Sequence, residues 1–311
     1  CIFIICKALG KVIIMNVIET LKNPYKILAW LSTKGFFKNM DDEKYIKMQY
    51  RGFIGKKLDL NNVKTFNEKI QWLKINDRNP LYTNMVDKYL VKQYVSDLIG
   101  DEYIIPTIGV YDSFEDINFS TLPNQFVIKT THDSGGVVVC KNKEIFDIDK
   151  ARKFINSSIR RNYYKLWREW PYKNVKPRII VEKYIEDEQT KELRDYKLFC
   201  FNGEMKLMFI ACDRQNNKSE TTFDFFDENF RHIDVINGHP TSKKIIECPP
   251  KFQEMKRLAE KLSKNIPLLR VDLYQSNGKI YFGELTFFHW SGYVPFKPEK
   301  YDEIFGNWIE I

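Results

Sequence analysis

The sequence is poor in cysteine and lacks the short cysteine motifs that hold a metal ion. Its 311 residues include six cysteines and four histidines, with no CxxC pair and no zinc-finger spacing between them. A zinc domain and a small disulfide-stapled fold are therefore poor matches. Cys140, Cys200 and Cys212 each end a β-like run, where a buried thiol acts as a small hydrophobic side chain. We expect reduced, structural cysteines and a reducing compartment.

Long hydrophobic runs are also missing. No apolar stretch reaches the roughly 20 residues that cross a bilayer. The opening run, residues 1–14, is interrupted by Lys7 and Lys11 and has no signal-peptide cleavage signature. Two interpretations stay open: the run lies upstream of a true start at Met15, or it is a peripheral anchor at the inner face of a membrane. We expect a cytoplasmic protein, with the peripheral contact as the alternative.

Several familiar nucleotide and nucleophile motifs do not occur. The absence of GxGxxG, GxxxxGK[ST] and GxSxG argues against a Rossmann site, a P-loop and a hydrolase elbow. Hydrophobic residues make up 43%, enough for a core, and the formal net charge is +8. This excess suits polyphosphate ligands, anionic glycans or a membrane surface as well as nucleic acid. Since no nucleic-acid-binding module is recognisable, we expect no nucleic-acid partner.

Helical patterns dominate the first part of the chain. Residues 1–85 are basic and aromatic and predict a mainly helical region, in which an apolar stripe from Phe66 to Leu73 favours core packing over binding. A further helix is expected to begin at Asp87 and to stop at Gly100. Residues 149–170 predict a basic, aromatic helix, and residues 251–264 an amphipathic one.

Strands and tight turns fill the rest. The strand at 126–129 is followed by the small-residue run THDSGG and the strand VVVC, which is the outline of a phosphate-covering hairpin. Asn202-Gly203 and Asn277-Gly278 each lie between alternating apolar runs and predict two more hairpins. The order of elements predicts an α+β fold with mostly antiparallel strand pairs.

The second Asn-Gly hairpin carries the most informative acids. Asp272 lies on its first strand and Glu284 on its second, both distant from the turn, and Arg270 shares a strand face with Asp272. Two oxygen ligands on paired strands beside a guanidinium suit a magnesium ion that bridges phosphate oxygens. Solvated carboxylates on an exposed strand are the alternative.

The order of charged motifs along the chain resembles the ATP-grasp superfamily, typified by the enzymes that join two D-alanines. The succession, over residues 87–292, is Asp87-Lys88, Lys129 before a glycine loop, Glu182-Lys183-Tyr184-Ile185 after a strand, and then Arg270, Asp272 and Glu284. More narrowly, TFNEKIQWLKINDRNPLYTNMVDKY, LPNQFVIKTTHDSGG, RDYKLFCFNGE and ELTFFHWSG are similar to the TupA-like ATP-grasp group of teichuronopeptide and capsular-polysaccharide proteins.

The resemblance implies an ATP and Mg²⁺ site, assigned residue by residue. It places the phosphates at Lys88, Lys129, His132, Ser134, Gly135 and Gly136, and the adenine at Glu182, Lys183, Tyr184 and Ile185. Glu188 is the candidate for the ribose, with Glu186 and Glu192 as alternatives. Asp272 and Glu284 would hold magnesium. The superfamily has asparagine where this chain has Thr286, a weaker ligand, so Thr286 either joins the metal set or only packs.

Other residues are candidates for the acceptor side. Asp195 and Lys197 share a strand face and either orient an acidic acceptor or amine, or form a surface pair. His289 is read as a general base or acceptor ligand, or as a satisfied loop histidine. Ser291 and Gly292 follow it and could turn around the carboxylate that is activated. Arg270 would steady charge on the transferring phosphoryl group or on the tetrahedral intermediate.

The resemblance implies an ATP-grasp fold and a carboxylate-amine ligase. Its expected substrates are a uronic acid of a cell-surface polysaccharide, or its nucleotide-sugar precursor, and an amino acid or small amine. The alternatives are a ligase for a peptide or small-molecule acid, and a nucleotide-binding scaffold of polysaccharide assembly without activity. The expected divisions are a helical region at 1–85 and two ATP-grasp subdomains at 86–185 and 186–311.

Overall fold

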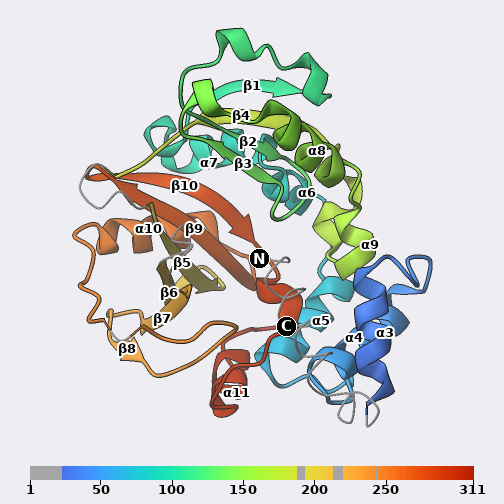
Figure 1. Cartoon of the computed structure of the whole chain (residues 1–311). Helices are drawn as coiled ribbons and strands as arrows, with labels where there is room; N and C mark the ends of the chain where they lie inside the picture. Colours follow the sequence, from blue (N-terminus) through green and yellow to red (C-terminus); the bar gives the residue numbers. More distant parts are fainter. Residues whose placement is uncertain (1–22, 188–192, 213–219, 243) are drawn as a thin grey trace. The chain divides into compact units, whose positions relative to one another are not determined.

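The computed structural model describes residues 23–187, 193–212, 220–242 and 244–311 (Figure 1). The opening run at 1–14, Glu188 and Glu192 lie outside these residues. None of the helices within the described ranges is both long and apolar enough to cross a membrane. Four cysteines are described, Cys140, Cys200, Cys212 and Cys248, and all four are free thiols.

The described chain divides into two compact units. Unit 1 runs from the start of the described chain to Asn61 and includes Gln71–Tyr89 and Pro106–Tyr184. Unit 2 comprises Asn62–Ile70, Leu90–Ile105 and Ile185–Ile311. These units interleave along the chain, whereas the expected subdomains at 86–185 and 186–311 are consecutive segments. That expected division stays a prediction.

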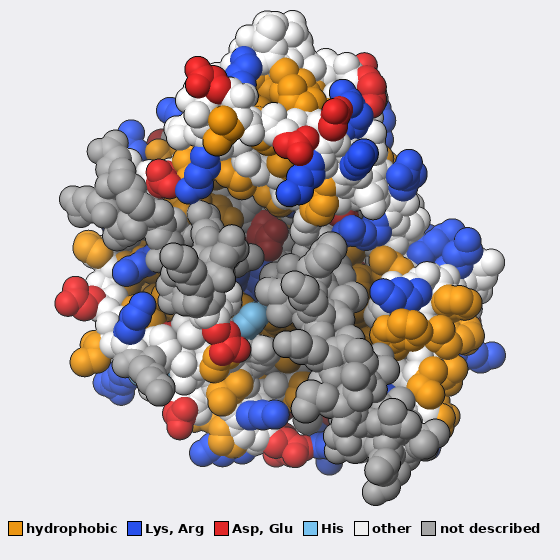
Figure 2. Space-filling model, in the orientation of Figure 1, with side chains coloured by type: hydrophobic (Ala, Val, Ile, Leu, Met, Phe, Trp, Pro, Cys, Tyr) orange, Lys and Arg blue, Asp and Glu red, His pale blue; other side chains and the backbone are white. Residues whose placement is uncertain are grey.

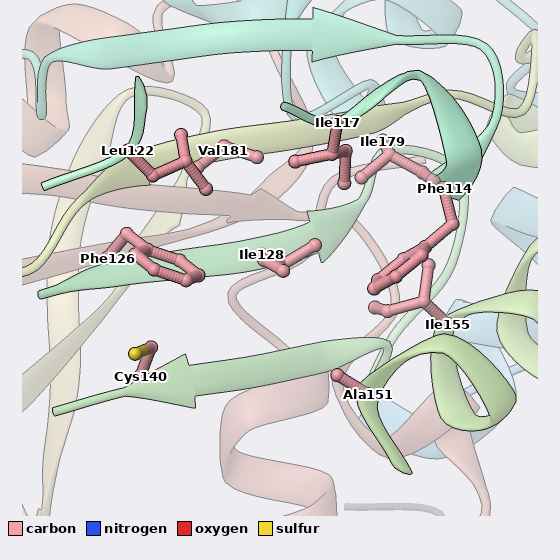
Figure 3. Close-up of a cluster of buried hydrophobic side chains, with 10 residues drawn as sticks. All are labelled: Phe114, Ile117, Leu122, Phe126, Ile128, Cys140, Ala151, Ile155, Ile179 and Val181. Carbon is pink, nitrogen blue, oxygen red and sulfur yellow. The ribbon is translucent and has the colours of Figure 1, made fainter. Parts of the chain in front are cut away.

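Unit 1 contains a four-stranded antiparallel sheet in the order β1-β4-β2-β3. Its strands are β1 (Thr107–Tyr111), β2 (Phe126–Thr130), β3 (Val137–Cys140) and β4 (Ile179–Lys183). Helix α8 (Ile148–Ile159) packs on the sheet through Ala151 and Ile155 (Figure 3). Fully buried Phe126 and Ile128 of β2 face this helix, so the alternating apolar residues of the strand form the core.

Unit 1 also contains further α-helices and 3-10 helices. They are α3 (Pro24–Thr33), α4 (Asp42–Phe53), α6 (Leu81–Val86), η2 (Phe114–Asp116), η3 (Phe119–Thr121), η4 (Lys143–Ile145), α9 (Tyr163–Trp167) and η5 (Trp170–Asn174). On the face in Figure 2, basic and acidic side chains are interspersed over the part of the molecule that carries β1, a pattern typical of a solvated surface. The expected helical N-terminal region is confirmed for the described residues.

Unit 2 contains a six-stranded antiparallel sheet in the order β10-β9-β5-β6-β7-β8. Its strands are β5 (Arg194–Phe201), β6 (Glu204–Cys212), β7 (Thr222–Asp227), β8 (His232–Ile233), β9 (Leu268–Ser276) and β10 (Lys279–Thr286). Helix α10 (Phe252–Leu262) buries its predicted apolar face, Phe252, Met255, Leu258 and Leu262, and packs on β5, β6 and β9. Its other helices are α7 (Leu90–Ile99), η1 (Asp101–Tyr103), η6 (His289–Gly292) and α11 (Lys300–Gly306). Helix α5 (Phe66–Asn76) spans both units.

Both Asn-Gly hairpins form as predicted. Asn202 and Gly203 have φ of 52° and 89° between β5 and β6, and Asn277 and Gly278 have φ of 50° and 72° between β9 and β10. Two consecutive residues with positive φ are the signature of the turn that matches strand twist, and Asn and Gly adopt it at little cost.

Two predicted helix boundaries were wrong. The helix expected from Asp87 begins at Leu90, because the Asp87 backbone is extended and its carboxylate accepts hydrogen bonds from the Tyr89 amide and from Arg178. The long helix expected at 149–170 is broken into α8, α9 and η5. Asn162 has an extended backbone and its side chain caps α9 by accepting from the Lys165 amide, so the chain starts a new helix there.

Candidate functional site

The glycine loop of unit 1 joins β2 to β3. Gly135 has a φ of +91°, a backbone conformation that residues other than glycine adopt only at an energetic cost. A Cβ at Gly136 would lie 2.0 Å from Thr130 Oγ1 and 2.7 Å from Asp133 Oδ1, so the loop backbone passes closer to these groups than any other residue would allow. Both glycines are therefore required by the shape of the loop.

Lys88 is bound to this loop. Its ammonium group donates a short hydrogen bond to the Asp133 carbonyl, and its amide donates to the Thr131 carbonyl at 3.1 Å. The Asp133 carboxylate is completely buried, accepts from the Thr130 hydroxyl, and forms an ion pair with Arg161 at 3.2 Å. The structure thus brings Lys88 and the glycine loop together.

Arg161 is a cation at the loop that sequence reasoning missed. Its Nη1 lies 3.2 Å from Asp133 Oδ2 and 3.5 Å from the Ser134 carbonyl oxygen, and its side chain remains 26% exposed. The only sequence signal was its place in the basic run 149–170, where every lysine and arginine reads as part of a solvated helix face.

His132 is a structural bridge in this loop. Its Nε2 lies 3.1 Å from the Arg161 carbonyl oxygen, so this nitrogen carries the proton and donates. Burial lowers the pKa of His132, with the nearby Asp133 carboxylate opposing this. The imidazole is 4% exposed and neutral at physiological pH, so its side chain does not add positive charge for a phosphate.

Lys129 and Glu182 lie on adjacent strands of the same sheet. Lys129 is opposite Ile180 and Glu182 is opposite Val127, which makes the two side chains diagonal neighbours on one face. Their Nζ and Oε2 atoms are 2.6 Å apart. The residues predicted to contact the phosphates and the adenine therefore hold each other in this structure.

The segment from Lys183 to Ile185, which is expected to bind the adenine through its backbone, makes contacts of its own. The Lys183 amide donates to the Pro106 carbonyl at 3.0 Å, so its N–H is engaged within unit 1. The Tyr184 ring has the Lys141 ammonium 5.5 Å from its centroid. Ile185 is half-buried and begins the last of the three segments that form unit 2.

Unit 2 gathers a buried cluster of charges around Arg270. The Arg270 guanidinium binds Asp272 at both carboxylate oxygens, with Nε 2.6 Å from Oδ1 and Nη2 2.7 Å from Oδ2. Lys197 lies directly opposite Asp272 across β5 and β9, contacts the same Oδ2 atom, and lies 2.8 Å from Asp195 Oδ2. Asp195, Lys197 and Asp272 are all buried, so the alternative of a surface pair is wrong.

A β-bulge brings Glu284 to the same place. The register of β9 and β10 shifts between Phe282 and Glu284, which places Glu284 directly opposite Asp272. Arg270 Nη2 lies 3.2 Å from Glu284 Oε1 and 2.9 Å from Thr286 Oγ1. The three oxygen groups proposed as metal ligands therefore converge on one positively charged atom.

Burial shifts the ionisation of this cluster. Burial raises the pKa of Asp272 to about 6, although the Arg270 and Lys197 charges pull it down. Burial also lowers the pKa of Arg270, but the Asp272 and Glu284 carboxylates more than compensate, so the net shift is upward. At neutral pH the Arg270 guanidinium and the Asp272 carboxylate are therefore both ionised and are held together in a low-dielectric environment.

His289 has both ring nitrogens engaged. Its Nδ1 is 2.8 Å from Arg270 Nη1, and its Nε2 is 2.8 Å from the side-chain oxygen of Asn237. Burial and the neighbouring positive charges of Arg270 and Lys197 lower its pKa well below the usual value. The structure thus does not give His289 the open nitrogen that a general base needs, and it favours the alternative of a histidine satisfied within the fold. Asn237 carried no signal in the sequence.

The residues after His289 have an unusual backbone. Trp290, Ser291 and Gly292 have φ of 51°, 56° and 67°, three consecutive residues in the left-handed region. Two of them are not glycine, and such strain persists only where the surroundings impose it. The turn is closed by the Ser291 amide, which donates to the Phe288 carbonyl at 2.8 Å.

The acids of unit 2 fit a magnesium ion. Among the described residues no group of three or more His, Cys, Asp and Glu side chains is placed to hold a metal. Magnesium needs fewer, because it keeps bound water and uses one or two carboxylates together with phosphate oxygens. Asp272 and Glu284, with the Thr286 hydroxyl, supply that donor set on paired strands.

The predicted residues therefore fall into two sets. Within unit 1 the structure brings Lys88 to the glycine loop and Lys129 to Glu182. Within unit 2 it brings Asp195, Lys197, Arg270, Asp272, Glu284, Thr286 and His289 into one hydrogen-bonded network. Ser291 and Gly292 follow His289 in a buried turn.

A family model described as TupA-like ATP-grasp matches residues 68–310. The chain belongs to the TupA-like ATP-grasp family. The expected α+β class is confirmed by the two antiparallel sheets with their helices, and the fold of this TupA-like protein is the ATP-grasp fold. Helices α3 and α4 lie before the matched residues.

Several solved structures resemble this TupA-like chain weakly. D-alanine–D-alanine ligase from Bacillus anthracis complexed with ATP is 16% identical with a TM-score of 0.36, over 65% of this chain and 53% of that one. The corresponding ligase from Helicobacter pylori is 15% identical with a TM-score of 0.38, over 72% and 59%. The ATP-grasp ligase PsnB complexed with minimal precursor, Mg and ADP is 8% identical with a TM-score of 0.40, over 82% and 64%.

The chain thus spans just over half the length of the D-alanine–D-alanine ligases that it matches. No curated protein sequence matches this TupA-like chain.

Proposed function

We propose that the protein is an ATP- and Mg²⁺-dependent carboxylate-amine ligase. The observation that carries the proposal is the convergence of Asp272, Glu284 and Thr286 on one nitrogen of Arg270. Phosphoryl transfer needs positioning and charge neutralisation more than a protein nucleophile. A buried guanidinium surrounded by metal-binding oxygens supplies both requirements.

The reaction would proceed in two displacements. A substrate carboxylate oxygen attacks the γ-phosphorus of ATP, the bond from that phosphorus to the β,γ-bridging oxygen breaks, and ADP leaves with the electron pair. The amine nitrogen then attacks the carbonyl carbon of the acyl phosphate, phosphate departs, and the amine proton passes to solvent. Bound magnesium would supply charge neutralisation on the phosphate oxygens, held by Asp272 and Glu284.

The chain's own residues have separate roles in this proposal. Lys88, Lys129 and the glycine loop would bind the phosphates, for which Lys129 must exchange its partner Glu182 for a phosphate oxygen. Glu182 would then accept from the adenine amino group. Arg270 would bind the oxygens that gain charge as each tetrahedral carbon or transferred phosphoryl group forms. Asp195 and Lys197 would orient the acceptor.

The proposed acid is a uronic acid of a cell-surface glycan or of its nucleotide-sugar precursor, and the proposed amine is an amino acid or small amine. Membership of the TupA-like group, which the sequence resembles over several long segments, supports this substrate class. Because ATP is the co-substrate, we place the reaction in the cytoplasm.

The test is ADP release that depends on both substrates. The protein is incubated with ATP, magnesium, glucuronate or its UDP derivative, and a panel of amino acids and small amines. We expect ADP release to need an acid and an amine together, and Asp272→Asn or Glu284→Gln to abolish turnover. Glu204→Gln, an exposed acid on β6 of the same sheet, is the matched control and should be as active as the wild type. ADP release without an amine, or wild-type turnover in Asp272→Asn, would overturn the proposal.

A further inference from the structure

A chain of three side chains leads away from the Arg270 cluster. Arg270 Nη1 lies 2.8 Å from His289 Nδ1, and an arginine N–H can only donate, so Nδ1 is the acceptor. The neutral imidazole then carries its proton on Nε2. That proton is donated to Asn237 Oδ1 at 2.8 Å.

The orientation of Asn237 is fixed in turn. Its amide nitrogen lies 3.0 Å from the Val294 carbonyl oxygen and 3.3 Å from that of Pro295. Since only the NH₂ group can donate to these carbonyls, the side-chain oxygen must face His289. The hydrogen bond between Arg270 and His289 and the one between His289 and Asn237 therefore each have only one possible donor and one possible acceptor.

Packing prevents the imidazole from turning. Asn237 is completely buried and His289 is 3% exposed. The Phe199 ring meets the imidazole edge to face, with centroids 4.9 Å apart, and the Phe209 ring lies at 5.6 Å. In such an environment a broken hydrogen bond would leave a buried polar group unsatisfied, so the network resists rearrangement.

The hydrogen bond to His289 would keep Arg270 in place when its carboxylate partners bind a metal ion. In the described residues its Nε and Nη2 atoms bind Asp272, Glu284 and Thr286, which are the groups proposed to bind magnesium. A carboxylate that binds a cation gives up part of its interaction with the guanidinium. The contact to His289 lies on the opposite amino group, Nη1, and does not compete with a metal ion.

We propose that Asn237 is a positioning residue, which acts through His289 to hold the guanidinium of Arg270 in its reactive orientation. The effect of Asn237 on catalysis rests on the proposed ligase function. The hydrogen-bonded arrangement of Asn237, His289 and Arg270 does not. His289 then works as a fixed acceptor for Arg270 and transfers no proton.

The arrangement is tested by NMR of protein labelled with ¹⁵N at histidine, without nucleotide. The chain has four histidines, and the His289 signals are assigned by their loss in His289→Asn. We expect one histidine in the Nε2–H form that keeps this form when the buffer is acidified to pH 5.5. In Asn237→Leu, which has similar volume and no acceptor, the same signals should shift or average. A protonated or Nδ1–H imidazole at His289 in the wild type would overturn the proposal.

Kinetics test the consequence. Asparagine at 289 offers an oxygen close to the position of Nδ1, whereas leucine offers no acceptor. We expect kcat to fall about 10- to 100-fold in Asn237→Leu and His289→Leu, with KM for ATP unchanged. His289→Asn should recover part of the loss, and His232→Asn, an exposed histidine in the same unit, should be unaffected. Equal loss in His289→Asn and His289→Leu would indicate a general base and overturn the proposal.

The two proposals fail in different ways. If the wild type shows the expected tautomer but joins no acid to an amine, the ligase function is wrong and the Asn237 arrangement stands. If the wild type is an active ligase and Asn237→Leu keeps its kcat, the function stands and the positioning role is wrong.

Discussion

Lys74 shows what burial does to a single charged residue in this protein. It lies in α5, is 1% exposed, and burial lowers its pKa to about 7, with the Glu169 carboxylate opposing that shift. A lysine in the unfolded chain has a pKa near the ordinary value of 10.5. Between these two values the unfolded chain binds a proton that the folded chain lacks. The contribution of Lys74 to stability therefore increases as the pH rises from about 7 to about 10.

We predict that this dependence disappears in Lys74→Met. The free energy of unfolding of the wild type, measured relative to that of the variant, should rise by about 2 kcal/mol from pH 7 to pH 9. Urea denaturation at both pH values measures it. Lys153→Met, at an exposed position of α8, should show no such difference. A constant gap between wild type and Lys74→Met would mean that Lys74 stays charged in the fold.

At the scale of elements, the glycine loop of unit 1 is constrained at both of its glycines. The two glycines constrain it differently: Gly136 has no room for a Cβ, whereas the space beside Gly135 is open and only its φ of +91° is unfavourable. In Gly136→Ala the Thr130 hydroxyl and the Asp133 carboxylate, both buried, would have to move.

We predict that Gly136→Ala destabilises the protein more than Gly135→Ala. The expected losses are about 2 to 3 kcal/mol for the first and about 1 kcal/mol for the second. Thermal unfolding of both variants measures the two losses of stability. The affinity for ATP, measured on the same variants, should fall most in Gly136→Ala because Asp133 also binds Lys88. The opposite ranking of the two variants would mean that the loop can shift away from a Cβ at Gly136 at little cost.

Elements whose signal is local could be predicted from sequence. Asn202-Gly203 and Asn277-Gly278 fix their turns because the residues themselves prefer positive φ. The start of α7 could not be predicted, because Asp87 is drawn out of the helix by Arg178, which lies 91 positions later in the chain. The same holds for the site residues. Asp272 and Glu284 could be predicted because they lie on one hairpin, whereas Asn237 could not, because it contacts His289 only through the tertiary fold.

At the scale of the whole molecule, the N-terminal helices are part of unit 1 although they precede the family match. Arg168, which is 2% exposed, donates to the carbonyl oxygens of Lys38 and Met40 at 3.0 Å and forms an ion pair with Asp42. Tyr45 also donates to the Leu166 carbonyl. Since these contacts join α4 to the segment around α9, the helical region is integrated with the residues of the family match.

The proposed contacts to the phosphates lie in unit 1 and the proposed contacts to magnesium lie in unit 2, so each can be followed by its effect on thermal unfolding. A ligand that binds only the folded state at 100 times its dissociation constant stabilises that state by about 2.7 kcal/mol. For a protein of this size we expect the Tm to rise by about 4 °C with ATP and magnesium at that concentration. Differential scanning fluorimetry measures the shift.

Two variants separate the contributions of the phosphates and of magnesium to the rise in Tm. Lys129→Met, in unit 1, should reduce the rise with or without magnesium, because it removes a phosphate contact. Asp272→Asn, in unit 2, should remove only the part of the rise that depends on magnesium, as judged by adding EDTA to the wild type. Glu204→Gln should behave as the wild type. If Asp272→Asn responds to magnesium as strongly as the wild type, the metal ion is bound elsewhere; if Lys129→Met keeps the full rise, the phosphates do not reach β2.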